Sequence, residues 1–257
     1  MSDRRERQKQ ARAAAKEAQR KATARRELRR RITVGLGLGA SVAVMLLLLG
    51  TFSSDEGDLP EALADFRDQP TACGGSLPDP VTEMQFESPV RQVFGSDSVV
   101  ATLETSCGTI VVELAAEDFP QTVSSFVFLA RNGYYDGTAF HRIATDFVIQ
   151  GGDPTATGAG GPGYSIPDEF PDTGFLYEEG VVAMANGGRG TTGSQFFIVT
   201  GDEAELLNPT FNVLGRVVEG FDVLERINQV ETRQQAGGRE RSYPTESVYL
   251  NSITITG

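Results

Sequence analysis

The sequence predicts a mainly β fold, in which a closed antiparallel barrel with two α-helices follows a single transmembrane helix. Three observations predict this fold. A stretch of 21 residues without a charge, 32–52, follows a basic N-terminus. From about residue 98 onward, short runs rich in β-branched and aromatic residues alternate with glycine-containing turns, which is typical of strands. Two segments of the same region have apolar residues at helical spacing instead.

The N-terminal segment is strongly basic and the rest of the chain is acidic. Residues 1–31 carry 13 Lys and Arg against four Asp and Glu, a net charge of +9, whereas the remaining residues carry −21. We expect residues 1–31 to form a helical cytoplasmic segment whose charge attracts anionic lipid headgroups. Nucleic-acid binding is the alternative for this segment, but its place directly before an apolar stretch makes it unexpected.

The uncharged residues 32–52 are predicted to be an uncleaved transmembrane signal anchor. A helix of this length spans about 31 Å, close to the ~30 Å hydrocarbon core of a bilayer. A buried core helix rarely lacks charge all round. A cleavable signal peptide usually has a shorter apolar region and an A-x-A-like site. Because the positive-inside rule places the basic flank in the cytoplasm, we expect a single-pass cell-membrane protein with an extracytoplasmic C-terminal domain.

Residues 53–96 are predicted to be a linker, because they are acidic and contain five prolines and a Gly-Gly pair. A short helix is expected within residues 59–68. Cys73 lies in this linker and Cys107 shortly after it, both on the predicted outer side. An oxidising compartment favours a disulfide between them, and two free thiols are the alternative.

Residues 97–257 are predicted to form one domain. Its elements begin with a hairpin over 99–114, followed by a helix that begins at Pro120 and ends at Gly133. A second helix is expected over 220–230, and an alternating strand over 246–256 closes the chain. Further short strands are predicted at 139–144, 147–150, 181–185, 195–200 and 212–218.

Three features that resemble functional motifs are not assigned a function. The segment GAGGPG, 158–163, fits the dinucleotide-binding spacing, but no helical pattern follows it, so a flexible surface loop is expected. Ser194 does not lie in the G-x-S-x-G motif that surrounds the nucleophile of many hydrolases. No metal site is expected at Asp153, Asp168 and Glu169. Scattered acidic residues in so acidic a chain are interpreted as solvated surface residues.

Aromatic and amide residues surround one arginine, Arg142, in strand-like segments. Taken alone they are equally consistent with core aromatics and a surface arginine. The blocks FHRIATDFVIQGGD and MANGGRGTTGSQFFIVT, however, strongly resemble the two signature blocks of cyclophilins, the cyclosporin-binding class of peptidyl-prolyl isomerases. The resemblance covers residues 98–257. It implies an eight-stranded antiparallel barrel capped by two helices, here in a membrane-anchored bacterial form.

The resemblance also implies the activity: acceleration of rotation about X–Pro bonds in exported, proline-containing polypeptides, with no cofactor and no metal. A non-catalytic peptide-binding or chaperone module is the alternative. Arg142 matches the family's catalytic arginine, which hydrogen-bonds the proline nitrogen as that nitrogen becomes pyramidal. The adjacent histidine, His141, shapes the site and is not a required base.

The other site residues follow from the same resemblance. Gln150 is expected to hold the arginine. The proline pocket is expected at Phe147, Val148, Phe197, Leu207 and Phe211. The groove for the peptide backbone is expected at Ala185, Asn186 and Gln195, with Asn186 acting mainly through its main chain.

The chain departs from the family's pattern in three ways. It has no tryptophan, and Leu206 stands near the place where many members put one at the pocket edge, so we expect weak cyclosporin binding. Phe211 replaces a histidine. The residues before Phe147 are Ala-Thr-Asp in place of the usual proline-glycine.

Overall fold

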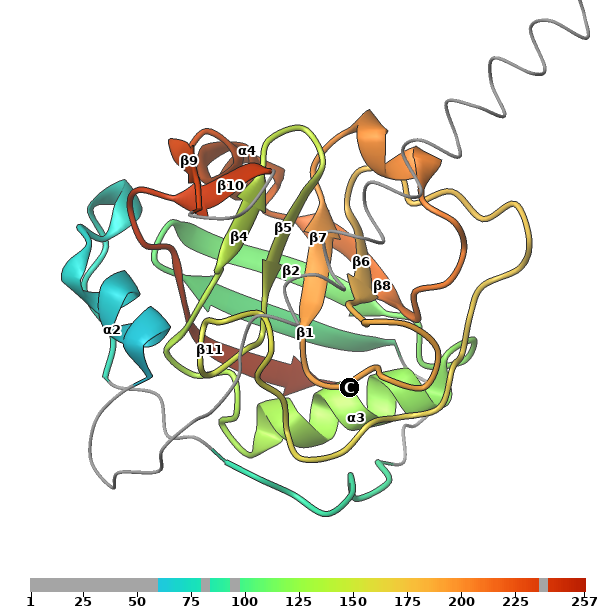
Figure 1. Cartoon of the computed structure of the whole chain (residues 1–257). Coiled ribbons are helices and arrows are strands. Elements are labelled where there is room, and N and C mark those ends of the chain that lie inside the picture. Colours follow the sequence, from blue (N-terminus) through green and yellow to red (C-terminus); the bar gives the residue numbers. More distant parts are fainter. Residues whose placement is uncertain (1–59, 80–83, 93–97, 236–239) are drawn as a thin grey trace, which may run out of the picture. The chain divides into compact units, whose positions relative to one another are not determined.

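A curled antiparallel sheet is the main element of the structure, a computed structural model that describes residues 60–79, 84–92, 98–235 and 240–257. Among these residues the sheet has nine strands in the order β3-β11-β1-β2-β8-β6-β7-β5-β4 (Figure 1). In chain order they are β1 Val99–Thr105, β2 Gly108–Leu114, β3 Thr138–Ala139, β4 Arg142–Ala144, β5 Val148–Gly151, β6 Val181–Met184, β7 Phe196–Val199, β8 Val213–Glu219 and β11 Tyr249–Thr256. The mainly β prediction is confirmed.

The predicted closed barrel of eight strands is wrong. The sheet is an open, curled half-barrel whose edge strands, β3 and β4, do not pair with each other. The sequence predicts one strand over 139–144, but the strand breaks at Phe140 and His141. β3 therefore has two residues, too few to continue a ladder across to β4, and only an isolated bridge links Ala139 to Asp153.

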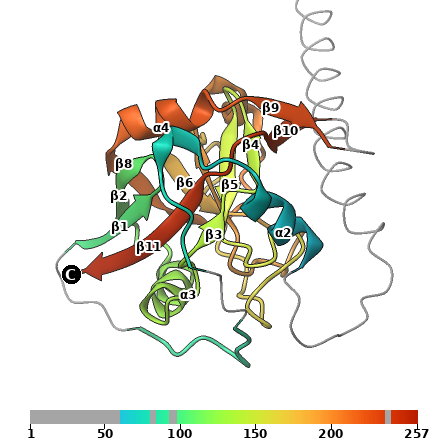
Figure 2. The same ribbon diagram turned by 90° about the vertical axis from the view of Figure 1, so that its left-hand side faces the viewer.

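The two predicted helices are confirmed, and they lie at opposite ends of the sheet (Figures 1 and 2). Helix α3 spans Pro120–Arg131 and helix α4 spans Phe221–Asn228. Phe119, at the N-cap of α3, gives no side-chain cap. The Glu169 carboxylate takes that place by accepting hydrogen bonds from the backbone of Gln121 and Thr122, at 3.1 and 2.7 Å.

The core fills the inside of the curl. Alternate residues of β1 and β2, such as Leu103 and Ile110, point inward and are fully buried, as the period of two in a strand requires. They meet an aromatic cluster in which Phe126 of α3 packs edge-on against Phe196 of β7, with ring centroids 5.9 Å apart. Burial of each such side chain stabilises the fold by roughly 1.5–3 kcal/mol.

Residues 60–79, called the strap below, differ from the predicted linker because they pack against the sheet (Figure 2). The strap contains helix α2, Glu61–Asp68, at the place where a short helix was expected, and a 3-10 turn, η1, Ala72–Gly74. Leu63 and Phe66, three residues apart on one face of α2, are buried. Both residues belong to a small apolar cluster with Ala139, Ala156, Tyr243 and Tyr249.

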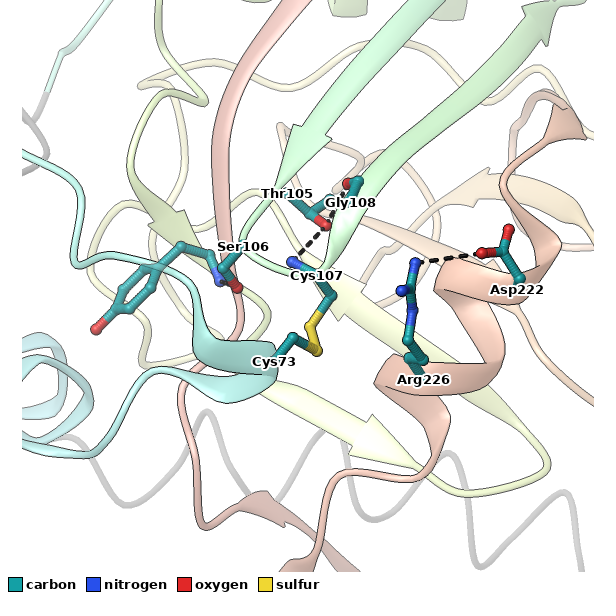
Figure 3. Close-up of a disulfide and its surroundings, with 8 residues drawn as sticks. Cys73, Thr105, Ser106, Cys107, Gly108, Asp222 and Arg226 are labelled. Carbon is teal, nitrogen blue, oxygen red and sulfur yellow. Dashed lines mark hydrogen bonds and ion pairs between the residues drawn. A yellow bond between two sulfur atoms is a disulfide. The ribbon is translucent and has the colours of Figure 1, made fainter.

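A backbone bridge and a disulfide also attach the strap. Its Thr71 forms a parallel bridge with Ser247, just before β11. Cys73 is joined to Cys107, in the turn between β1 and β2, by a disulfide (Figure 3). The disulfide closes a loop across a sequence separation of 34 residues.

A second, two-stranded sheet was not predicted. It consists of β9, Thr232–Gln234, and β10, Arg241–Pro244, and β10 lies beside β4. The predicted segments 1–31 and 32–52 lie outside the described residues. Within the ranges that the structure describes, no helix is both long and apolar enough to cross a membrane.

Candidate active site

One row of cross-strand neighbours carries the candidate site. Arg142 of β4 faces Gln150 of β5, and Gln150 faces Phe197 of β7. Directly paired residues of neighbouring strands share a face of the sheet. The alternate residues Ile143, Ile149 and Ile198 are fully buried in the core, so the row of Arg142, Gln150 and Phe197 lies on the outer face.

The Arg142 guanidinium is held between an amide and an aromatic ring. Its Nη1 donates to Gln150 Oε1 at 3.3 Å, and its central carbon lies 5.4 Å from the centroid of the Phe147 ring. That distance is within the range of a cation–π contact. The side chain remains 25% exposed, so it is not sealed off from solvent.

A chain of amides continues from this arginine. Gln150 Nε2 donates to Gln195 Oε1, and Gln195 Nε2 donates to the carbonyl of Gly160, both at 3.0 Å. Because each amide both accepts and donates, the three bonds fix the orientation of both glutamines. Gly160 belongs to the GAGGPG segment, which the structure places in a loop with no helix after it.

The apolar part of the site consists of the expected aromatics. Phe147, Val148 and Phe197 are buried, and the Phe211 ring packs edge-on against Phe197 with centroids 5.4 Å apart. Flat, rigid rings at this spacing form a wall that could receive a proline ring. Leu207 is half-buried at the end of the 3-10 turn η2, Asp202–Leu206, and its neighbour Leu206 is 51% exposed.

Tyr177 supports this wall, and sequence reasoning missed it. Its ring packs against both Phe197 and Phe211, with centroids 6.3 and 6.1 Å away. Its hydroxyl donates to the Phe211 carbonyl at 2.8 Å and accepts from the Phe211 N–H at 3.1 Å. Burial raises the pKa of Tyr177 to about 12, so the phenol stays neutral and can make both bonds. Its only sequence signal is an aromatic residue inside a glycine-rich loop.

The groove residues lie next to this row. The Ala185 N–H donates to the Gln195 carbonyl at 2.8 Å, which continues the strand pairing. The Asn186 side chain donates to the Thr210 carbonyl at 2.9 Å and accepts from the Gly188 N–H at 3.1 Å. These bonds occupy its amide, an arrangement compatible with a role for Asn186 through its main chain.

His141 lies beside Arg142 but is 7% exposed. Burial is the largest influence on its pKa and lowers it; the charge of Arg142 lowers the pKa further, and Asp153 opposes both. The imidazole is therefore neutral at neutral pH. A buried, neutral ring next to the accessible arginine fits a role in shaping the site.

The turn before Phe147 accommodates its unusual residues. Asp146 has a positive φ of 59°, a conformation that Asp adopts more readily than most residues. Its N–H donates to Asn228 Oδ1 at 3.1 Å, and Asn228 Nδ2 donates back to its carboxylate at 3.2 Å. Because Asn228 belongs to α4, the helix holds the turn and thereby the position of Phe147.

The interpretation of the acids as solvated surface is wrong for Asp153. This residue is fully buried, and its carboxylate accepts from the N–H groups of Thr155, Gly158 and Gly160 at 2.7–3.0 Å. Asp168 accepts from the Gly190 N–H, and Glu169 caps α3. Ser194 is buried, with its hydroxyl 2.7 Å from the Gly152 carbonyl, and is not placed to act as a nucleophile.

An ion pair completes the site, and no sequence signal pointed to it. Glu240, just before β10, accepts from Arg142 Nε and Nη2, both at 2.8 Å. The two residues are 98 positions apart in the chain. Figure 1 shows β10 beside β4, which is the arrangement that brings them together.

The sequence of residues 100–255 matches the family described as cyclophilin type peptidyl-prolyl cis-trans isomerase/CLD. The chain belongs to this family. Peptidyl-prolyl cis-trans isomerase-like 1 of Mus musculus is 49% identical over 137 residues, 52% of this chain and 81% of that protein. Peptidyl-prolyl cis-trans isomerase A of Mycobacterium tuberculosis is 38% identical over 174 residues, 62% of this chain and 93% of that protein.

The fold is also similar to a solved cyclophilin structure. A cyclophilin type peptidyl-prolyl cis-trans isomerase of Cryptosporidium parvum, crystallised in the presence of the dipeptide Ala-Pro, superposes with a TM-score of 0.55 and 29% identity. The match covers 63% of this chain and 99% of that one. The cyclophilin domain described above therefore catalyses cis–trans isomerisation of the bond before proline.

Proposed function

We propose that Arg142 is the catalytic group of this isomerase and that the phenylalanine wall holds the proline ring. The observation that carries the proposal is the placement of a partly exposed arginine over Phe147, in one row with Gln150 and Phe197. A cation that can donate hydrogen bonds thus lies beside an apolar wall, which is the pairing that an X–Pro substrate requires.

Physical chemistry explains how such a site accelerates rotation. The peptide bond resists rotation by about 18–20 kcal/mol, because the nitrogen lone pair is delocalised into the carbonyl. In the twisted state the lone pair is localised on nitrogen, where it can accept a hydrogen bond. An arginine remains charged at physiological pH and presents fixed donors to that lone pair. Gripping the proline ring allows the rest of the peptide to turn about it.

The test is cis–trans exchange of a short X–Pro peptide by the full-length chain and by Arg142→Ala. We expect acceleration by the parent and a loss of roughly 10²–10³ in the variant, as for other removed transition-state donors. Arg216→Ala is the matched control, since Arg216 also pairs with a carboxylate, Glu178, at 3.1 Å. A folded parent without activity would favour a non-catalytic peptide-binding module. Undiminished activity of Arg142→Ala would remove Arg142 from the mechanism.

We further propose that the domain works outside the cytoplasm, anchored by residues 32–52, on exported proline-containing polypeptides. The charge asymmetry of residues 1–52 supports this location, with the basic residues 1–31 near anionic headgroups. The Cys73–Cys107 disulfide also supports it, because disulfides persist in oxidising compartments. Protease added to intact cells stripped of their wall should digest the C-terminal domain. Protection until the membrane is lysed would contradict the proposal.

A further inference from the structure

Glu240 occupies one complete edge of the catalytic arginine. Its two carboxylate oxygens accept from Nε and Nη2 of Arg142, each at 2.8 Å, in the paired geometry that carboxylate and guanidinium prefer. Glu240 is 34% exposed and Arg142 25%. The contact is thus partly shielded from water, unlike the pairs Arg216–Glu178 and Arg241–Glu231, whose side chains are at least half exposed.

A count of donors shows what this contact leaves free. The guanidinium has five N–H donors in one plane. Glu240 takes one on Nε and one on Nη2, and Gln150 takes one on Nη1. The two remaining hydrogens lie one on each terminal nitrogen, Nη1 and Nη2. Glu240 and Gln150 together therefore fix the rotation of the plane and leave two donors for a substrate.

Glu240 is itself held in place. Glu240 directly precedes β10, and β10 lies beside β4. The strap adds to this support, because its Phe66 ring packs on Tyr243 of β10 with centroids 5.0 Å apart. Burial opposes ionisation of Glu240, but the hydrogen bonds and charge of Arg142 outweigh burial and lower its pKa. The carboxylate is therefore charged at neutral pH.

We propose that Glu240 is a positioning residue for the isomerase reaction, which orients the Arg142 guanidinium so that its uncommitted donors face the proline nitrogen. The inference rests on the proposed catalytic role of Arg142.

The opposite role, in which Glu240 blocks the arginine, fits the geometry less well. A substrate does not need to displace Glu240, because two donors of the guanidinium remain uncommitted. The pair of Arg142 and Glu240 has no net charge, so it would stabilise an anionic transition state less well than a lone arginine. Rotation about a peptide bond, however, shifts a lone pair without creating an ion, so orientation of the donor outweighs net charge.

The test measures kcat and KM separately for the full-length parent, Glu240→Ala, Glu240→Gln, Arg142→Ala and the double variant. Glu240→Ala should lower kcat roughly five- to twentyfold with less than a twofold change in KM, because misplaced catalytic groups lose transition-state interactions. Glu240→Gln, which keeps one acceptor oxygen, should lie in between. In the double variant the loss should equal that of Arg142→Ala alone, because Glu240 then has nothing to position.

Glu231→Ala is the matched control, because Glu231 directly precedes β9 and its carboxylate pairs with Arg241 instead of Arg142. Its kcat should equal that of the parent. The Arg142 Nε–H signal in NMR spectra provides an independent readout, and it should exchange faster with water in Glu240→Ala.

The outcomes separate the two proposals. If Arg142→Ala keeps full activity, the proposed function fails. If Arg142→Ala is inactive but Glu240→Ala has parental kcat, only the positioning role fails. A rise in kcat or kcat/KM in Glu240→Ala would show that Glu240 competes with the substrate. An additive loss in the double variant would show that Glu240 acts independently of Arg142. Either of the last two results overturns the inference.

Discussion

The strap and the sheet face that carries Arg142 hold their side chains in place in different ways. On the sheet face, strand register places Arg142, Gln150 and Phe197 in one row, and backbone hydrogen bonds maintain it. The strap lies outside the residues matched by the family, 100–255. It is attached by a small apolar cluster, one bridge, one disulfide and side-chain hydrogen bonds such as that from the Tyr249 hydroxyl to the Phe66 carbonyl.

The difference indicates where mutations should act. A side chain on the sheet face can be changed without loss of the register, so such changes should affect activity more than stability. The strap depends on a few side chains, so changes there should affect stability first. Three experiments test this division, beginning with the largest expected change in stability, and a fourth concerns the buried histidine of the site.

Phe66→Ala should have the largest effect on stability. Phe66 is fully buried, and removal of a buried phenylalanine ring costs about 3–5 kcal/mol. Denaturant unfolding of the full-length chain measures the change. Leu77→Ala, at an exposed position of the same strap, is the control and should stay near the parent. Equal stability of Phe66→Ala and the parent would mean that the strap is not docked in solution.

Loss of the disulfide should cost slightly less. In the chain-entropy model a cross-link over 34 residues contributes about 3–4 kcal/mol. We expect Cys73→Ser with Cys107→Ser to lower the melting temperature, and a reducing agent to lower that of the parent but not of the double variant. A melting temperature of the parent that does not respond to reduction, after the thiols are shown to be free, would contradict this account of the strap.

Tyr177→Phe tests the sheet side of the comparison. The change removes two hydrogen bonds to the Phe211 backbone, worth roughly 0.5–1.5 kcal/mol each, and keeps the ring contacts. We expect KM to rise a few-fold with little change in kcat, because the proline wall loosens while Arg142 stays in place. Tyr164→Phe, which loses a bond to Ser125 instead, is the control. A fall in kcat with KM unchanged would link Tyr177 to the chemical step instead.

His141 should give the smallest effect, on the pH dependence of stability. Its folded-state pKa is lowered, chiefly by burial. The unfolded chain therefore binds a proton near the ordinary pKa of about 6.5, while the folded chain does not, and stability falls as the pH drops below that value. His141→Asn should flatten this part of the profile, measured by unfolding at a series of pH values. Identical slopes in the two proteins would show that the histidine titrates normally.

Much of the fold could be predicted from the sequence. Alternation identified β1 and β2, and helical spacing with Pro120 and Gly133 identified α3. The opening of the barrel could not be predicted, because an apolar run does not reveal the break at Phe140 and His141. The strap was taken for a linker because its composition is acidic and rich in proline, and two buried residues on an eight-residue helix are a weak periodic signal.

The site was predictable where it depends on local motifs. The sequence blocks around Arg142 and Phe197 match the family's signature blocks, so the roles of their residues could be assigned from the resemblance. Tyr177 and Glu240 could not be found in this way. Tyr177 lies in a loop without secondary structure, and Glu240 meets Arg142 only through the packing of β10 beside β4. Ion pairs between distant segments leave no pattern in one sequence.

Arg142 is expected to act on the rotation step and not on binding of the peptide. NMR exchange spectroscopy at saturating X–Pro peptide measures the cis–trans rate on the enzyme, and titration of the same peptide measures its affinity. For Arg142→Ala we predict a rate roughly 10²–10³ lower with peptide affinity within a few-fold of the parent. A bound-state rate equal to that of the parent, with affinity lost instead, would contradict the account.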